Sequence, residues 1–239
     1  MVMEMDGVLL INKPQGKTSH DLVDFVRRKF KFKKVGHCGT LDPMATGLLM
    51  LVLGKATKIQ DLLMNEEKVY AGTMKLGQCT DSQDADGQIT EEKPVPAITQ
   101  EEFLKVMQEF SGDFYQTPPM YSAVKIDGVP LYKLARAGKE VEREPRLVHI
   151  FHHKITQWNP PSISFEILCS KGFYVRTYCH DIGQKIGCGA HLTQLCRIKS
   201  GNFSLDRALS WEKLETLQTI DDLREHILSL PEVSQMRRQ

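Results

Sequence analysis

The sequence lacks the features that mark a membrane or secreted protein. No apolar run approaches the roughly 20 residues needed to span a bilayer, and the N-terminal segment MVMEMDG has no basic part followed by an apolar signal core. The six cysteines contain no CxxC pair and no regular spacing, which argues against a disulfide framework and against a structural zinc site. We therefore expect a cytoplasmic protein with reduced thiols and no contact with a membrane.

Complete motifs for nucleotide or metal binding are also missing. Gly16-Lys17-Thr18 is similar to the end of a phosphate-binding P-loop, but Ile11 stands where that motif needs its first glycine. The acidic segment 81–87 does not fit a calcium loop, because Lys93 would stand at the last ligand position. The cysteines and histidines of residues 179–196 match no common zinc spacing. We expect neither a metal nor a cofactor.

Opposite charges are segregated along the chain, although the net charge is only +1. The net charge is +5 over residues 1–60, −8 over residues 61–113 and +6 over residues 114–200. The densest basic stretch, RRKFKFKK at residues 27–34, follows a helical pattern, where cations also interact favourably with the helix dipole. Two basic blocks around an acidic one suit a protein that presents a positive face to a polyanion, for which nucleic acid is the obvious candidate.

Hydrophobic periodicity predicts an α+β fold in a single domain over residues 1–239. Apolar runs and alternating patterns predict strands at residues 8–11, 48–53, 69–76, 147–155 and 163–169. The segment SKGFYVRT is predicted as a further strand, which runs into a helix that ends near Gly187. Helices are predicted after Ser19, taken as an N-cap, and at residues 59–64 and 99–110, and a loop at 77–87.

Residues 115–146 differ from the rest of the chain. This segment combines repeated Pro and Gly with six Lys and Arg residues, which predicts a long basic excursion from the core. Long structured excursions of this kind usually carry function.

The loop Gly36–Gly47, GHCGTLDPMATG, presents one carboxylate, that of Asp42, directly before an apolar run. Its glycines permit positive φ angles or the close approach of another segment, and Pro43 biases the preceding residues toward extended geometry. Taken alone, an Asp-Pro pair is more typical of a turn than of a catalytic acid. The catalytic interpretation depends on the segments that accompany this loop.

Five segments together resemble the TruB family of tRNA pseudouridine synthases. In chain order they are GVLLINKPQGKTS, GHCGTLDPMATG, KVYAGTMKLGQCTDSQDADG, PPMYSAVKIDG, and SKGFYVRT followed by GCGAHLTQLCR. The resemblance covers about residues 6–215 and implies a catalytic fold with a large mixed, mainly antiparallel sheet and flanking helices. It also identifies residues 115–146 as a thumb-like RNA-binding insertion. Members of the family usually continue into a small RNA-binding PUA-type domain, for which we expect no room in this chain.

The resemblance implies a reaction. Uridine at position 55 in the T-loop of tRNA would be flipped out of its stack, its N1–C1′ bond broken, and the base rejoined through C5 without a cofactor. Asp42 is the implied catalytic carboxylate, which either removes a ribose proton or attacks the sugar or the base. Two other functions stay open, namely an RNA-binding chaperone that folds tRNA and a pseudouridine synthase that acts on another RNA.

The resemblance also implies roles for binding residues. Those for the target nucleoside are Tyr70, Arg176, Leu195, Tyr174 and His37. Tyr70 would stack on the flipped base, Arg176 would pair with Asp42, and His37 would occupy the space that the base leaves. Without the resemblance, Tyr70 and Leu195 are typical core residues of strands, and Arg176 is a typical surface cation of a strand.

Contacts with the RNA backbone are expected from cations on surface segments. The candidates are Lys13, Lys125 and Arg136, because Lys and Arg bind phosphates without reading the base sequence. The expected partner is the T stem-loop of tRNA. We expect no obligate protein partner and a monomeric enzyme.

Overall fold

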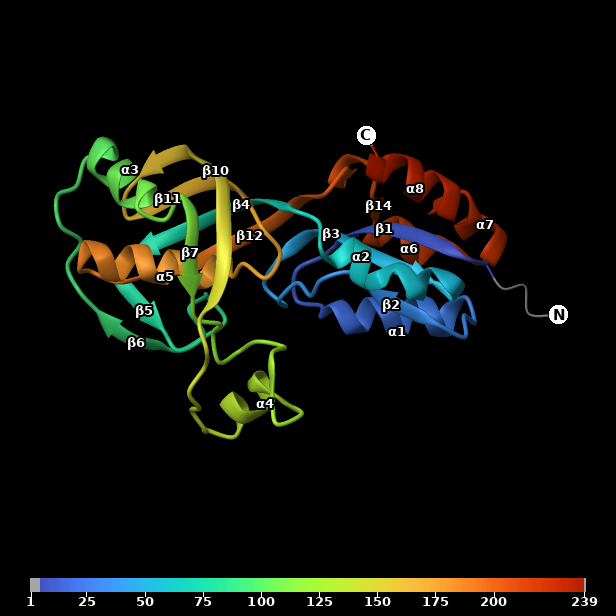
Figure 1. The fold of residues 1–239 in the computed structure, drawn as a ribbon, viewed down its shortest axis with the longest axis horizontal. Helices are drawn as coiled ribbons and strands as arrows, with labels where there is room; N and C mark the ends of the chain where they lie inside the picture. The colour runs from blue at the N-terminus through green and yellow to red at the C-terminus, as the bar shows by residue number, and fades with distance from the viewer. Residues whose placement is uncertain (1–4, 239) are drawn as a thin grey trace. The chain divides into compact units, whose positions relative to one another are not determined.

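The structure is a computed structural model that describes residues 5–238. The chain forms two compact units (Figure 1). The first unit contains the residues up to Tyr70 together with those from Cys196 onward, and the second unit contains Ala71–Leu195. The prediction of one catalytic domain stays a prediction, and each unit is described by itself.

The first unit is built around two long antiparallel strands, β1 (Gly7–Lys13) and β3 (Thr46–Leu53). Both are nearly continuous apolar runs, and their side chains are buried on both faces, as expected for strands inside a core. The strand order is β14-β1-β3-β12, and β3 pairs with the end of β12 in parallel. The other strands of this unit are β2 (Val35–His37), β13 (Phe203–Ser204), β14 (Leu209–Ser210) and β15 (Ile227–Leu228).

The helices of the first unit come from both ends of the chain. They are α1 (Ser19–Lys29), α2 (Gln60–Met64), α6 (Trp211–Thr216), α7 (Ile220–Arg224) and α8 (Leu230–Arg238), with the 3-10 helices η1 (Gly54–Ile59) and η2 (Leu205–Arg207). The N-cap of α1 is Thr18, so the prediction of Ser19 as the cap is wrong. Thr18 forms a capping box with Asp21, whereas the hydroxyl of Ser19 bonds to Leu41.

The second unit has the strand order β12-β4-β11-β10-β7. Its strands are β4 (Lys68–Leu76), β7 (Gly112–Gln116), β10 (Arg146–Asn159), β11 (Ser162–Cys169) and β12 (Ala190–Ser200), of which β4 and β12 also contribute residues to the first unit. Burial alternates along β4 and β11, as expected where one face of a sheet packs on a core. Helices α3 (Gln100–Gln108) and α5 (Val175–Ile186) contribute Phe103 and Tyr178, both fully buried, to that core.

These elements confirm the α+β prediction with a large mixed sheet. The predicted strands at 8–11, 48–53, 69–76, 147–155 and 163–169 and the helices at 59–64 and 99–110 are present with shifted ends. Two predictions are wrong. The segment 77–87 is not all loop, because β5 (Gln78–Thr80) pairs there with β6 (Ile89–Glu92). SKGFYVRT is not a strand, because Lys171-Gly172 forms a turn and α5 begins at Val175.

The basic excursion projects from the ends of β7 and β10 in the second unit (Figure 1). It contains the two-residue strands β8 (Lys125–Ile126) and β9 (Val129–Pro130), followed by the short helix α4 (Leu131–Arg136). Asp127 and Gly128 join β8 to β9 with positive φ angles of 51° and 79°, as a tight hairpin turn requires. The excursion is therefore a structured insertion, and its role in RNA binding stays a prediction.

Candidate active site

In the first unit, Lys13 is completely buried beneath the loop that carries Asp42. Its Nζ donates to the carbonyl oxygens of Pro14 at 2.9 Å, Lys17 at 2.6 Å and Pro43 at 3.3 Å. The prediction that Lys13 is a surface cation for phosphate is therefore wrong. Its ammonium group instead fixes the backbone on both sides of the site, since hydrogen bonds from a charged donor are stronger than neutral ones.

A second buried cation, Arg197 of β12, holds the same loop from the other end. Its Nε donates to the carbonyl oxygen of Leu48 at 2.7 Å and its Nη2 to that of Gly39 at 3.1 Å. Gly47 lies against this arginine with φ +99°, and a Cβ there would come within 2.4 Å of the Arg197 carbonyl oxygen. The sequence prediction missed Arg197. The available signal was its place in the segment GCGAHLTQLCR.

Hydrogen bonds close to Asp42 make the loop a defined turn. The Ser19 hydroxyl accepts from the Leu41 amide at 2.9 Å and donates to the Leu41 carbonyl at 3.1 Å. The amide of Ala45 donates to the Asp42 carbonyl at 3.1 Å. Asp42 itself is half-buried, between the buried Leu41 and the exposed Pro43. The turn and the catalytic interpretation are therefore compatible, because the turn presents the carboxylate at a partly exposed position.

His37 is the last residue of β2, within the segment Gly36–Gly47 that also carries Asp42, and it is half-buried. Its Nδ1 is buried, and no hydrogen-bond partner is recorded for it within residues 5–238. Burial lowers the pKa of His37, and the nearby charges of Arg197 and His20 lower it further. The ring is therefore neutral near pH 7, which suits a side chain that fills space better than one that holds a phosphate.

In the second unit, Arg176 forms a buried ion pair with Asp84. Its Nη1 lies 3.2 Å from Asp84 Oδ2, and the two side chains are 6% and 4% exposed. Its Nη2 also donates to the carbonyl oxygen of Tyr121 at 2.6 Å, at the start of the basic insertion. The guanidinium group is thus fixed in the first turn of α5. Asp42 belongs to the other unit, so its pairing with Arg176 stays a prediction.

Asp84 is a site residue that the sequence prediction missed, since segment 81–87 was interpreted only as an acidic turn. Its Oδ1 accepts from the Ser82 hydroxyl and from the Asp86 amide, the latter at 3.1 Å. The Thr80 hydroxyl donates to its backbone carbonyl at 2.7 Å. The two bonds to Oδ1, with the ion pair to Arg176, satisfy a carboxylate that would otherwise be costly to bury. The turn is built around the acid that holds Arg176.

Tyr174 is the N-cap of α5 and is half-buried. Its backbone amide donates to Gln116 Oε1 at 2.8 Å, and its carbonyl accepts from Gln116 Nε2 at 3.1 Å. Because Gln116 is the last residue of β7, this pair of bonds joins the start of α5 to the point where the insertion leaves the sheet. The position of Tyr174 is thereby fixed, and its contact with substrate stays a prediction.

Four further residues that were predicted to contact the RNA lie on the strands β4 and β12 or on the basic insertion. Tyr70 on β4 and Leu195 on β12 are each 9% exposed. Lys125 and Arg136 are exposed on the insertion, and the Arg136 guanidinium lies 5.6 Å from the centre of the Tyr132 ring. Their exposure is what a phosphate contact requires, and the assignments stay predictions.

Among residues 5–238, no group of three or more His, Cys, Asp or Glu side chains is placed to hold a metal ion. None of the described helices has the length and apolar character to cross a membrane.

Comparison with known proteins identifies the family. The sequence model of the TruB family pseudouridylate synthase (N terminal domain) matches residues 27–175, and that of the tRNA pseudouridylate synthase B C-terminal domain matches residues 176–233. The chain is 53% identical over 214 residues to tRNA pseudouridine synthase B of Opitutus terrae, covering 90% of this chain and 89% of that protein. It is 50% identical over 228 residues to the Syntrophotalea carbinolica protein of the same name, covering 95% and 74%.

Solved structures agree on the fold. The crystal structure of a Cbf5-Nop10-Gar1 complex contains a chain that matches with a TM-score of 0.68 and 28% identity, covering 86% of this chain and 52% of that one. An H/ACA RNP bound to a substrate RNA containing 2′-deoxyuridine gives a TM-score of 0.67 at 23% identity, covering 95% of this chain and 57% of that one, which supports the fold alone. The chain thus spans little more than half of these solved chains. With both sequence models and relatives of about half identity in agreement, the chain belongs to the TruB family of pseudouridylate synthases.

Proposed function

We propose that this chain isomerises uridine to pseudouridine in tRNA, at position 55 of the T-loop. The observation that carries the proposal is the Asp42 loop, which two buried cations, Lys13 and Arg197, fix through backbone carbonyl groups. A rigid loop with a half-buried carboxylate is suited to covalent or acid–base chemistry at a sugar or base. Family membership supports the choice of reaction, since relatives carry the name tRNA pseudouridine synthase B.

The reaction is an isomerisation and needs no external reactant. The N1–C1′ bond of the target uridine breaks, the uracil turns within the pocket, and a C5–C1′ bond forms while the proton on C5 leaves and N1 gains one. Asp42 acts in its ionised form. It either removes a ribose proton, to give a glycal intermediate, or attacks the sugar or the base directly.

The other residues of the site bind and orient the nucleoside. Tyr70 stacks on the flipped base, and Tyr174 and Leu195 line the pocket. Arg176, which Asp84 holds in place, pairs with Asp42 and keeps that carboxylate charged.

Groups outside the pocket hold the RNA in its reactive shape. The neutral ring of His37 fills the space that the base leaves. Lys125 and Arg136 on the insertion contact backbone phosphates. With these roles the chain acts on tRNA as a monomer in the cytoplasm, whereas the Cbf5 chain of the solved structure is in a complex with Nop10 and Gar1.

Tritium release from C5-labelled uridine in an unmodified tRNA transcript tests the proposal. The Asp42→Asn variant should release tritium at least about a hundredfold more slowly than wild type, while its affinity for tRNA stays similar. Asp61→Asn is the matched control, because Asp61 is an exposed aspartate of α2 in the same unit. The product should map to the T-loop uridine.

The same assay separates the alternative functions. Folded wild-type protein that binds tRNA tightly but releases no tritium would favour the chaperone. Release only from another RNA would favour a synthase of different specificity.

A further inference from the structure

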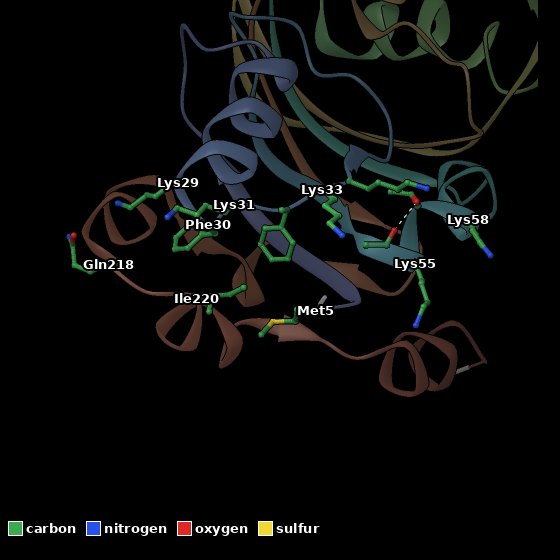
Figure 2. A pocket seen from close by; sticks show the side chains of 13 residues that line it. Met5, Lys29, Phe30, Lys31, Lys33, Lys55, Lys58, Gln218 and Ile220 are labelled. Atoms are coloured by element: carbon green, nitrogen blue, oxygen red, sulfur yellow. Dashed lines mark hydrogen bonds between the residues drawn. The ribbon is translucent and has the colours of Figure 1, made fainter. Parts of the chain in front are cut away.

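The first unit contains a cavity of about 490 Å³ that the proposed reaction does not use (Figure 2). We call it the lysine pocket. Thirteen residues line it, and none of them is Asp or Glu. Six are lysines, namely Lys29, Lys31, Lys33, Lys34, Lys55 and Lys58. They come from two segments, the end of α1 with the loop that follows it, and η1 after β3.

The floor of the lysine pocket is apolar. Phe30 and Phe32 alternate with the lysines along the chain and are only 6% and 8% exposed, and Met5 and Ile220 add further apolar surface. Lysine stems pack along apolar surface while their charged ends reach water. An apolar base under a ring of ammonium groups suits a phosphorylated ligand with an apolar part, such as a nucleotide unit.

Several of these charges are not balanced by the protein. Lys55 lies 3.3 Å from Asp6, and Lys29 donates to the Glu215 carbonyl at 2.6 Å. For the exposed side chains of Lys31, Lys34 and Lys58, no ion pair or hydrogen bond is recorded within the described residues. Clustered cations repel one another, and a bound anion would relieve that repulsion.

The backbone at Lys31 supports a role for its side chain. Lys31 has a φ of +56° at the position after the C-cap of α1, where glycine is the usual residue. A lysine in this left-handed conformation is strained, and such strain is found most often where a side chain serves a function. The alternative residue, glycine, would fit the backbone better and would remove the charge.

The lysine pocket is distant from the target nucleotide. Asp42 precedes the first residue of β3, whereas Gly54 and Lys55 directly follow the last. An eight-residue strand spans roughly 25 Å, so the two sites lie at opposite ends of a rigid element. An RNA bound at Asp42 would therefore have to extend well beyond the target nucleotide to reach the pocket.

We propose that the lysine pocket binds the phosphate backbone of tRNA at a point outside the T arm. The inference rests on the proposed function in taking tRNA as the RNA. A nucleotide unit in the pocket would lay its ribose or base on the apolar floor, and its phosphates would contact Lys31, Lys34 and Lys58. The site would add affinity without contributing to the chemical step.

The test compares two double variants that each remove two positive charges. Lys34→Gln with Lys58→Gln alters the pocket, and Lys199→Gln with Lys213→Gln alters exposed lysines of the same unit that do not line it. The pocket variant should bind full-length tRNA roughly tenfold or more weakly at 0.1 M salt, and the slope of log K against log salt should fall by about 1 to 2. Its rate of tritium release at saturating tRNA and its affinity for an isolated T-arm hairpin should match those of the control.

A third variant, Lys31→Gly, excludes a folding artefact. It removes a cation while relieving backbone strain, so it should melt no lower than wild type and still bind full-length tRNA more weakly. Unchanged tRNA affinity and salt slope in all pocket variants would overturn the proposal. An equal loss of affinity for the T-arm hairpin would also overturn it, because the lysines would then act at the target loop.

Titration with AMP distinguishes RNA from a free nucleotide. If AMP binding depended on the pocket lysines while tRNA affinity did not, the pocket would serve a free nucleotide and the assignment to RNA would be wrong. The test of the lysine pocket can succeed or fail independently of the test of the proposed reaction. Wild type that releases no tritium but binds tRNA through the lysine pocket would overturn the reaction and support the pocket.

Discussion

Replacing Asp84 with Asn removes the charge that Arg176 faces while keeping the size of the side chain. The asparagine oxygen can still accept from Ser82 or Asp86, so the turn retains most of its hydrogen bonds. The principal loss is the ion pair at 3.2 Å between two side chains that are 6% and 4% exposed. Arg176 would then be a buried cation that has lost the negative charge of Asp84 but keeps its hydrogen bond to the Tyr121 carbonyl.

The magnitude follows from the burial and the distance. Two unit charges 3.2 Å apart attract by about 5 kcal/mol at an effective dielectric constant of about 20. Breaking a buried pair by removing one partner costs about 3–5 kcal/mol, because the other charge stays buried. Since the Tyr121 carbonyl still accepts from Arg176, we expect a loss of about 3 kcal/mol in the free energy of unfolding. That is a large part of the roughly 5–15 kcal/mol that stabilises a typical protein.

Urea unfolding of four proteins measures this loss, namely wild type, Asp84→Asn, Arg176→Met and the double variant. The midpoint of Asp84→Asn should fall by about 1 M or more, for a slope of about 2–3 kcal/mol per M. The loss of stability in the double variant should be about 2 kcal/mol smaller than the sum of the two single losses. The reason is that Arg176→Met removes the buried charge that Asp84→Asn leaves without a counter-charge. A loss below about 1 kcal/mol for Asp84→Asn, with additive effects in the double variant, would show that the pair does not stabilise the unit and would refute the reasoning.

Three further predictions concern other buried groups. Lys13→Met should destabilise the protein by about 2–4 kcal/mol in urea and slow tritium release more than it weakens tRNA binding, because three carbonyl groups around the Asp42 loop lose their donor. Gly47→Ala should cost at least about 2 kcal/mol in urea unfolding, because its Cβ would come within 2.4 Å of the Arg197 carbonyl oxygen. Asp181→Asn should stabilise the protein by about 1–2 kcal/mol at pH 7, because burial raises the pKa of Asp181 to about 6.

Each of these has its own check. Gly187→Ala is the control for Gly47, because Gly187 has a φ of +92° with no atom within 4 Å of its Cβ position, so strain alone should cost about 1 kcal/mol. For Asp181 the sign is tested by pH. In the folded state Asp181 holds its proton more tightly than in the unfolded state, so the free energy of unfolding of wild type falls as the pH rises from about 4 to about 6. The stabilisation by Asp181→Asn should therefore vanish near pH 4. A stabilisation by Asp181→Asn that did not depend on pH would contradict the explanation from burial. Unchanged tritium release in Lys13→Met would contradict the role of Lys13 in fixing the Asp42 loop.

The parts of the fold that were predicted correctly have local causes. β1 and β3 are continuous apolar runs, and α3 has apolar residues at helical spacing, so periodicity alone identifies them. The start of α5 has a different cause. Phe173, Tyr174 and Val175 favour a strand by composition, but the turn at Lys171-Gly172 and the bonds from Gln116 to Tyr174, 58 positions away, set the helix.

The site residues that were missed have distant partners. Asp84 is 92 positions from Arg176, and Arg197 is 149 positions from Leu48, so no local pattern indicates either contact. Lys13 differs from these two residues, because most of its partners are close in sequence. Its buried ammonium group bonds to the carbonyl groups of Pro14 and Lys17. A lysine at the end of a buried strand was a sequence signal for an interior role, and it was outweighed by the usual preference of lysine for the surface.

The bonds from Arg197 to Leu48 and Gly39 have a consequence for biosynthesis. The loop that carries Asp42 emerges from the ribosome about 150 residues before the arginine that fixes it, which at typical rates of elongation is an interval of roughly 10–30 s. During that interval the nascent chain contains Asp42 but not Arg197. Such long-range pairing is acquired late in folding, and the Asp42 loop should therefore become fixed only after β12, which carries Arg197, has formed.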